Sequence, residues 1–139
     1  MSSTAPGEGG TRGQKGNNEA IVEAACEKDG LPRMKQLVGE GYDISSKNQH
    51  GWTATFQAAQ RGDKEILRWL LDNKADVNAV DNCGQSPLHG CAINGYLELT
   101  KMLLDAGADR TLKTTVGQQT ALDYAREHGR DEVAAELSK

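Results

Sequence analysis

The chain has 139 residues, of which 37% are hydrophobic and 26% charged, and its formal net charge is −4 at pH 7. This length suits one domain, and the lack of any apolar stretch of about 18 residues excludes a membrane-spanning helix. Without a cluster of Lys or Arg, the mildly acidic chain is also unsuited to nucleic acid, whose phosphates require a basic surface.

Residues 1–17, "MSSTAPGEGGTRGQKGN", are rich in glycine and contain no large apolar residue after Met1. Such a segment buries too little apolar surface to offset the entropy of ordering, so we expect a disordered Gly-rich tail. It lacks the apolar centre of a signal peptide. It also lacks the Gly-Lys-Ser/Thr order and the preceding strand of a phosphate-binding loop, although it contains Lys15.

From Glu23 onwards, similar segments recur at intervals of 33 residues. In chain order they read "EAACEKDGLPRMKQLVGEGYDIS", "GWTATFQAAQRGDKEILRWLLDNKADVNA", "GQSPLHGCAINGYLELTKMLLDAGADRTL" and, after a one-residue insertion, "GQQTALDYAREHGRDEVAAELSK". A fixed period of this length is typical of repeat proteins, whose units bury their apolar faces against neighbouring units.

The third segment shows what each unit contains. Ser86 can cap a helix that begins at Pro87, and Gly95 can end it, because glycine readily adopts the left-handed conformation that closes a helix. A second apolar run begins at Leu97 and stops at Gly107. The pattern predicts two short helices per unit, each below the roughly 12 residues that a helix needs to be stable alone in water.

The third segment resembles the ankyrin motif T-P-L-H-x-A-A-x-x-G-H-x-E-I-V-x-L-L-L-x-x-G-A-D, and "GDKEILRWLLDNKADVNA" resembles its second half. This resemblance implies an all-α solenoid of about four helix-turn-helix repeats joined by β-hairpin loops. The expected ankyrin-repeat domain covers residues 18–139, with repeats at about 18–47, 48–80, 81–113 and 114–139. Hairpin tips and first helices would then form a concave surface that binds other proteins.

Residues that carry chemistry do not form a recognisable catalytic or metal-binding pattern. The sequence contains no dinucleotide-binding glycine motif, no nucleophile elbow and no H-E-x-x-H motif. His50 falls at an expected hairpin tip and His128 near the end of a first helix, whereas His89 matches the ankyrin histidine that bonds one hairpin to the next. We therefore expect no enzyme, no metal and no cofactor.

Two aromatic residues stand out where the second repeat departs from the ankyrin motif. Trp52 lies at an expected hairpin position, and Phe56 replaces the motif histidine beside Thr55, which replaces a leucine. Aromatic side chains near an exposed edge are candidates for interface anchors, because they offer large contact areas at low entropic cost. The alternative is that Phe56 fills the space that Thr55 leaves and packs between hairpins.

The same geometry gives the other candidate partner-binding residues on hairpins and first helices. They are polar or apolar side chains that the resemblance places on the concave side: His50, Gln57, Gln60, Arg61, Gln85, Ile93, Asn94 and Tyr96. Each polar member has the alternative role of an ordinary solvated residue. Asn78, in "LLDNKADVN", resembles asparagines that are hydroxylated in ankyrin repeats, although an asparagine here commonly closes a turn.

The sequence thus predicts a non-enzymatic adaptor, scaffold or inhibitor that binds a protein of unknown identity. One alternative is a more specific regulator of a kinase, a transcription factor or actin-capping protein, the last suggested by "GADRTLKTTVGQQTALDYA". An alternative of another class is a ligand-binding or enzymatic protein. We expect a monomer, because both terminal repeats carry charged residues on faces that have no further neighbour. We expect it in the cytoplasm, with the nucleus as the alternative, because the three cysteines suit a reducing compartment.

Overall fold

The computed structural model describes residues 19–139, so the predicted tail at 1–17 lies outside the described residues. Within 19–139 the chain forms eight α-helices and no β-strand. The helices are α1 (Glu19–Ala25), α2 (Leu31–Gly39), α3 (Ala54–Arg61), α4 (Lys64–Asp72), α5 (Pro87–Asn94), α6 (Leu97–Asp105), α7 (Ala121–Glu127) and α8 (Asp131–Leu137). One helix pair falls within each of the four expected repeat ranges. None of these helices combines the length and apolar character needed to cross a membrane.

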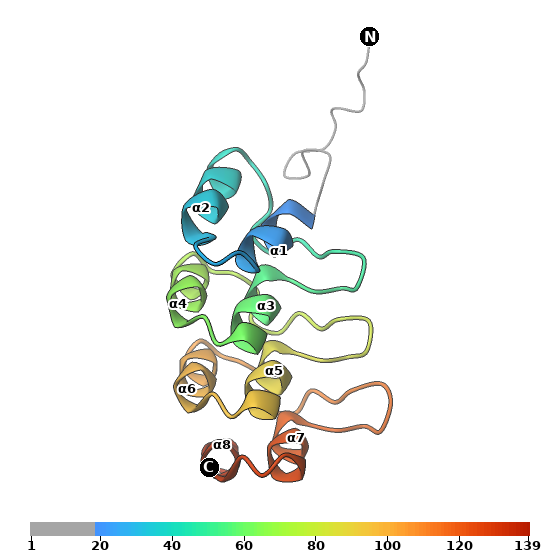
Figure 1. The fold of residues 1–139 in the computed structure, drawn as a ribbon. Coiled ribbons are helices and arrows are strands. Elements are labelled where there is room, and N and C mark those ends of the chain that lie inside the picture. The colour runs from blue at the N-terminus through green and yellow to red at the C-terminus, as the bar shows by residue number, and fades with distance from the viewer. Residues whose placement is uncertain (1–18) are drawn as a thin grey trace.

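The helix pairs stack in order along the molecule, as Figure 1 shows. Among the first helices, α1 contacts α3, α3 contacts α5 and α5 contacts α7. Among the second helices, α4 contacts α6 and α6 contacts α8. The core runs between the two columns, where Leu67, Leu70 and Leu103 are fully buried. The all-α repeat solenoid predicted from the 33-residue period is therefore confirmed.

The first helices begin as the sequence predicts. Ser86 caps α5 and Pro87 is its first residue, while Gly95 ends it in the left-handed conformation with φ 75°. The side chain of Thr53 caps α3 by accepting a hydrogen bond from the backbone N–H of Phe56 at 3.1 Å. In α5 the corresponding residue, His89, accepts a hydrogen bond from the backbone N–H of Ser86 and so completes a reciprocal capping box. Phe56 of α3 has no acceptor atom and cannot form this second bond.

The connecting loops follow the path of hairpins but are not paired strands, which refines the expected β-hairpins. In each of the three, a backbone hydrogen bond joins the two arms, and in the first two a second bond closes the turn, from Gly51 to Asn48 and from Gly84 to Asp81. The bonds between the arms join Asn48 to Trp52, Asp81 to Gln85, and Thr114 to Gln119. Arms this short cannot build the ladder that defines a strand, and the loops project to one side of the helices (Figure 1).

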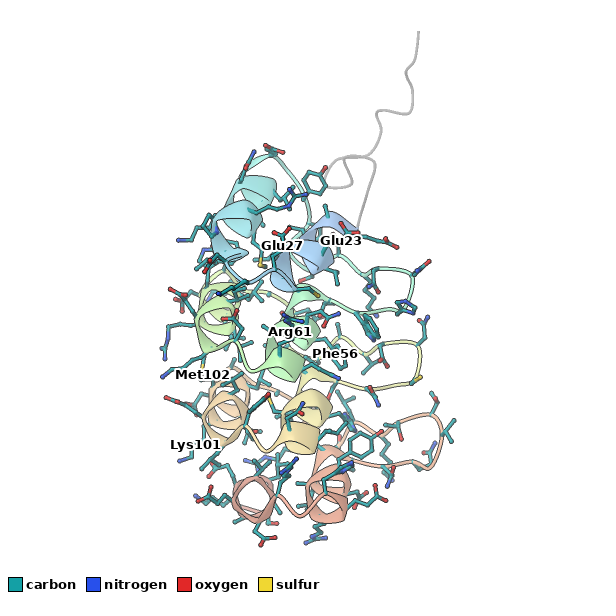
Figure 2. The ribbon with its side chains drawn as sticks, in the orientation of Figure 1. Glu23, Glu27, Phe56, Arg61, Lys101 and Met102 are labelled. Atoms are coloured by element: carbon teal, nitrogen blue, oxygen red, sulfur yellow. The ribbon has the colours of Figure 1, made fainter. Side chains whose placement is uncertain are left out.

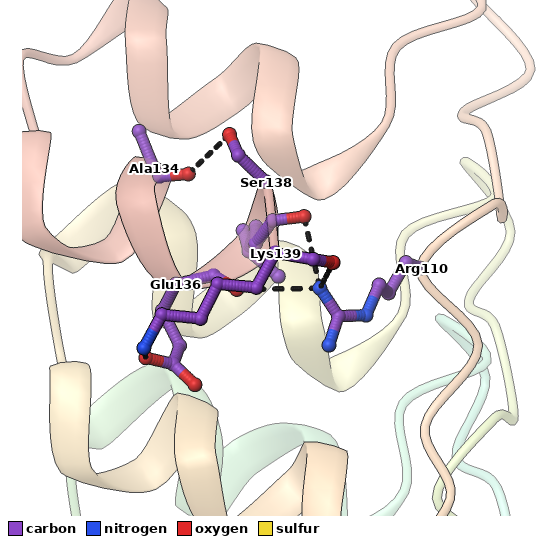
Figure 3. Close-up of polar contacts among 6 residues, drawn as sticks. Arg110, Ala134, Glu136, Ser138 and Lys139 are labelled. Carbon is purple, nitrogen blue, oxygen red and sulfur yellow. Dashed lines mark hydrogen bonds and ion pairs between the residues drawn. The ribbon is translucent and has the colours of Figure 1, made fainter.

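The last repeat is tied to the stack by Arg110, as Figure 3 shows. Its guanidinium nitrogen donates to the backbone oxygens of Glu136, Leu137 and Lys139 at 3.2, 3.0 and 3.1 Å. A cation at this place satisfies carbonyls that the end of a helix leaves without partners and also complements the helix dipole. Arg126 on α7 is exposed where inner first helices bury Ala59 and Ala92, so the outer face of this repeat is polar.

We expect Arg110→Ala to lower the free energy of unfolding by about 1–2 kcal/mol, because hydrogen bonds from a charged donor to α8 are lost. The loss should concentrate at the end of the stack, since repeats are coupled mainly to their neighbours. Hydrogen exchange should show faster exchange of the α8 amides and little change in α3. Arg126→Ala, which removes an exposed arginine nearby, is the matched control. Unchanged α8 exchange in Arg110→Ala would contradict this anchoring role.

Candidate protein-binding surface

The tips of the three hairpin loops are joined to one another, and we name residues 48–52, 81–85 and 114–119 the hairpin ridge. The backbone N–H of Asn82 donates to the oxygen of His50 at 3.1 Å, and the Asn82 side chain donates to the oxygen of Gln49 at 3.0 Å. Thr115 donates to the Cys83 oxygen through both its backbone N–H and its hydroxyl. The three loops therefore form one continuous surface that is held together by hydrogen bonds.

Trp52 lies within this ridge and is half-buried. Its indole N–H donates to the Oδ2 atom of Asp81 on the next hairpin at 3.1 Å. Its ring lies 4.5 Å from the ring of His50 and 6.2 Å from the ring of Phe56, measured between centroids. Trp52 is thus held in one orientation, with part of its surface left accessible to solvent.

Phe56 is buried, with only 4% of its surface exposed. Its ring is roughly parallel to that of Trp52 and supports it from below the ridge. The packing alternative raised from the sequence describes this position, and the adjacent Thr55 is buried as well. A side chain this enclosed has almost no surface to offer, so we leave Phe56 out of the proposed contact set.

The remaining candidates divide between exposed and partly buried positions. Gln60 and Arg61 on α3 and His50 on its hairpin are exposed, whereas Gln57, Gln85, Ile93, Asn94 and Tyr96 are partly buried. Asn94 and Gln85 are held by hydrogen bonds, from the Asn94 amide to the Gln60 oxygen at 3.1 Å and from the Gln85 amide to the Tyr124 hydroxyl at 3.2 Å. Tyr96 packs over Gly62, where an added Cβ would come within 2.8 Å of its ring.

We name the exposed side of α1, α3, α5 and α7 the first-helix face. Figure 2 shows that it carries Glu23 on α1 and Arg61 on α3, with Glu27 in the loop that follows α1, whereas Lys101 and Met102 lie on the side of the second helices. Glu27 and Arg61 also line one hollow between the first two repeats, together with Lys28, Gly62, Asp63 and Lys64. Both carboxylates and cations line this hollow, so its charge is mixed.

Two potentially reactive side chains, Cys91 and His89, are buried and serve packing. Burial raises the pKa of the Cys91 thiol to about 12, which keeps it protonated and a poor nucleophile. Burial also lowers the pKa of His89, whose Nδ1 atom accepts from the Ser86 N–H at 3.0 Å and whose Nε2 atom bonds the Gln119 oxygen at 2.9 Å. His89 therefore joins α5 to the next hairpin, as the sequence predicted. Among residues 19–139, no group of three or more His, Cys, Asp or Glu side chains is arranged to hold a metal ion.

Asn78 lies between two repeats. Its side-chain oxygen accepts a hydrogen bond from the backbone N–H of Asp109 at 2.7 Å, and its own N–H donates to the Asp76 carboxylate at 2.8 Å. Ser45 makes the same kind of bond one repeat earlier, to the N–H of Asp76. Asn78 thus helps to hold adjacent repeats in register, and its modification stays a prediction.

Two residues that sequence reasoning did not single out matter for this surface. Asp81 holds Trp52 in place, and Val116 at the tip of the last hairpin is 84% exposed. The signal for Val116 was present in the sequence, because it lies in a loop with one extra residue. The pairing of Asp81 with Trp52 joins residues 29 positions apart and depends on how two hairpins stack.

Comparison with known proteins agrees with this architecture. A family model described as ankyrin repeats, in three copies, matches residues 21–114. The chain belongs to the ankyrin-repeat family. Its fourth helix pair, α7 and α8, lies beyond the matched residues and continues the same stack.

Individual relatives share this repeat region. BCL-6 corepressor-like protein 1 from Homo sapiens is 40% identical over 89 residues, or 64% of this chain and 5% of that protein. Tyrosine-protein kinase Shark from Drosophila melanogaster is 31% identical over 118 residues, or 84% of this chain and 13% of that protein. Protein phosphatase 1 regulatory subunit 12A from Mus musculus is 35% identical over 79 residues, or 55% of this chain and 8% of that protein. The chain therefore spans only a small part of the length of these relatives.

Proposed function

We propose that this chain is a non-enzymatic adaptor, scaffold or inhibitor that binds a protein partner through its hairpin ridge and first-helix face. The observation that supports this proposal most directly is the row of cross-linked hairpins beside the exposed Gln60 and Arg61. Ankyrin repeats are a protein-interaction fold, and one relative is named as a regulatory subunit of a phosphatase.

Three features of the described residues favour recognition over catalysis. The Cys91 thiol is buried and protonated, both ring nitrogens of His89 are engaged, and the hollow beside Arg61 has mixed charge. Small-molecule sites are usually concave and mostly apolar with a few converging polar groups, which this hollow is not. A regulator that inhibits its target by covering it needs a binding surface, such as the hairpin ridge and first-helix face, and no reactive group.

Partner binding can be tested with variants that leave the core intact. We expect the double variant Gln60→Ala/Arg61→Ala to weaken binding at least about tenfold, because arginine is enriched among residues that dominate interface energies. The measurement is quantitative affinity capture from native lysate with the full chain, followed by mass spectrometry.

Lys101→Ala, on the side of the second helices, is the control and should retain the same proteins (Figure 2). Equal recovery of every protein by the wild type and a folded Gln60→Ala/Arg61→Ala variant would contradict a role for the first-helix face. Saturable stabilisation of the chain by a nucleotide or metal ion would instead favour a ligand-binding protein.

A further inference from the structure

The hairpin ridge differs in charge from the rest of the chain. Two carboxylates from neighbouring helices, those of Glu19 and Glu127, accept hydrogen bonds from Gln49 and Gln119 of the ridge at 3.3 and 3.0 Å. Within the ridge itself, Asp81 is the single Asp, Glu, Lys or Arg residue, although 26% of the whole chain is charged. Both oxygens of that carboxylate face donors within the ridge. Oδ1 accepts from the N–H groups of Cys83 and Gln85 at 2.9 and 2.8 Å, and Oδ2 accepts from Trp52 at 3.1 Å. The one formal charge is therefore used to hold the ridge together.

The tips of the ridge are nevertheless open to solvent. The exposed positions carry amide, imidazole, thiol, hydroxyl and apolar groups, from Gln49, His50, Asn82, Cys83, Thr115, Val116 and Gln118. Val116 is the one large hydrophobic residue that is fully exposed within residues 19–139. A single exposed valine is ordinary, but this one extends a ridge that already contains the half-buried Trp52.

The ridge is also organised before any partner arrives. Each hairpin is closed on itself, and each is bonded to the next through Asn82 or Thr115. Ordering of loops is one of the main costs of association, so a surface that is already fixed retains more of its contact energy. Interface cores are depleted of charged residues and enriched in aromatic ones. The ridge has one charged residue, Asp81, and contributes the indole ring of Trp52.

The neighbouring first-helix face has a different character. It exposes Glu23 on α1, Glu27 in the loop after α1, Arg61 on α3 and Glu127 on α7. A partner bound mainly there would need complementary charges, and its affinity would fall with salt. The two surfaces therefore select different partner chemistries.

We propose that the hairpin ridge is the principal docking surface and that it binds an uncharged segment of a protein partner bearing aliphatic or aromatic side chains. The first-helix face then supplies surrounding contacts. This inference rests on the proposed function and adds to it the location of the main contact and the chemistry of the partner. Val116 and the accessible part of Trp52 provide the apolar contacts, and the ridge amides bond the partner's backbone.

The test is a selection of random displayed peptides against the full chain. We expect the recovered peptides to be rich in Leu, Ile, Phe, Trp or Tyr and poor in charged residues. A synthetic peptide of the most frequent sequence should lose less than about twofold in affinity between about 50 and 200 mM salt, since few ion pairs form. Val116→Asp should weaken its binding at least about tenfold, because it places a charge where apolar contact is made.

Ala135→Asp, which adds the same charge at an exposed position of α8, is the matched control and should bind like the wild type. His50→Asp provides a second exposed ridge variant, so the test does not depend on one substitution. Recovery of no peptide above background, or unchanged binding by both ridge variants, overturns the inference.

A further outcome separates this inference from the proposed function. Lys- or Arg-rich peptides whose binding is lost in Glu23→Gln/Glu27→Gln, and kept in Val116→Asp, overturn the ridge as the docking surface. The same result supports a protein-binding function, because the first-helix face then performs it. If neither the ridge variants nor Glu23→Gln/Glu27→Gln lose binding, the result counts against both this inference and the proposed function.

Discussion

Replacing His89 with alanine is expected to lower the free energy of unfolding by about 3 kcal/mol. His89 is 1% exposed and bonds both the N-terminus of its own helix and the hairpin of the next repeat. Alanine removes these bonds and leaves the Gln119 oxygen and the Ser86 N–H without their partner. An unsatisfied buried polar group costs about 1–3 kcal/mol, and the lost ring adds a packing term.

Denaturant titration measures this change, and His50→Ala is the matched control because His50 is exposed at a hairpin tip. We expect the control to stay within about 0.5 kcal/mol of the wild type. A loss below about 1 kcal/mol in His89→Ala would show that water or nearby side chains replace the imidazole.

The pH dependence of the difference in stability between the wild type and His89→Ala gives an independent check. Burial lowers the pKa of His89 in the folded chain, so the unfolded chain binds more protons as the pH falls below the ordinary histidine value of about 6.5. The contribution of His89 to the free energy of unfolding is therefore fully present above about pH 6.5 and is lost as the pH falls toward the lowered pKa of the folded chain. His89→Ala lacks this loss, so the difference between the two proteins should narrow on acidification. A difference that widens would contradict the role of neutral His89 as an acceptor.

His89 also shows how much of this fold the sequence could reveal. The period of 33 residues, the cap at Ser86 and the terminating Gly95 were readable because each depends on neighbours within one repeat. The bond from His89 to the next hairpin followed from the family resemblance, and the structure confirms it. Local signals of this kind recur in every unit, so each repeat reinforces the interpretation of the others.

The candidate surface was less accessible to sequence reasoning. Trp52 and Phe56 are close in sequence and both aromatic, yet Trp52 is half-buried on the ridge and Phe56 is buried. Their difference depends on Asp81, which fixes the indole from the following hairpin. Side chains at loops are positioned by contacts between repeats, and the repeat pattern specifies the register of those contacts but not their partners.

Arg110 illustrates the same limit at the end of the stack. It occupies the position of Ile44 and Val77 in earlier repeats, both partly buried and packed against the core. The change from an aliphatic residue to arginine distinguishes the third repeat from the first two, but only the structure shows that its guanidinium reaches the carbonyls of α8 (Figure 3).

Replacing Gly84 with alanine should cost about 3 kcal/mol and should loosen the hairpin ridge. Gly84 has φ +80°, a conformation in which a side chain costs about 1–2 kcal/mol. An added Cβ would also lie 2.9 Å from the backbone nitrogen of Thr115. Because that neighbour is backbone, the following hairpin must move, which strains the 3.0 Å bond from Thr115 to the Cys83 oxygen.

Gly107→Ala separates the two contributions, because Gly107 has φ +96° but no atom within 4 Å of the added Cβ. We expect this control to lose about 1 kcal/mol, from backbone conformation alone. Denaturant titration gives the difference between the variants, and hydrogen exchange at the Thr115 amide reports the hairpin directly. Equal losses in both variants, with Thr115 still protected, would mean that adjacent hairpins are not held in close contact. Such a ridge would have to be ordered by its partner, and it would lose the advantage in affinity that a surface fixed before binding provides.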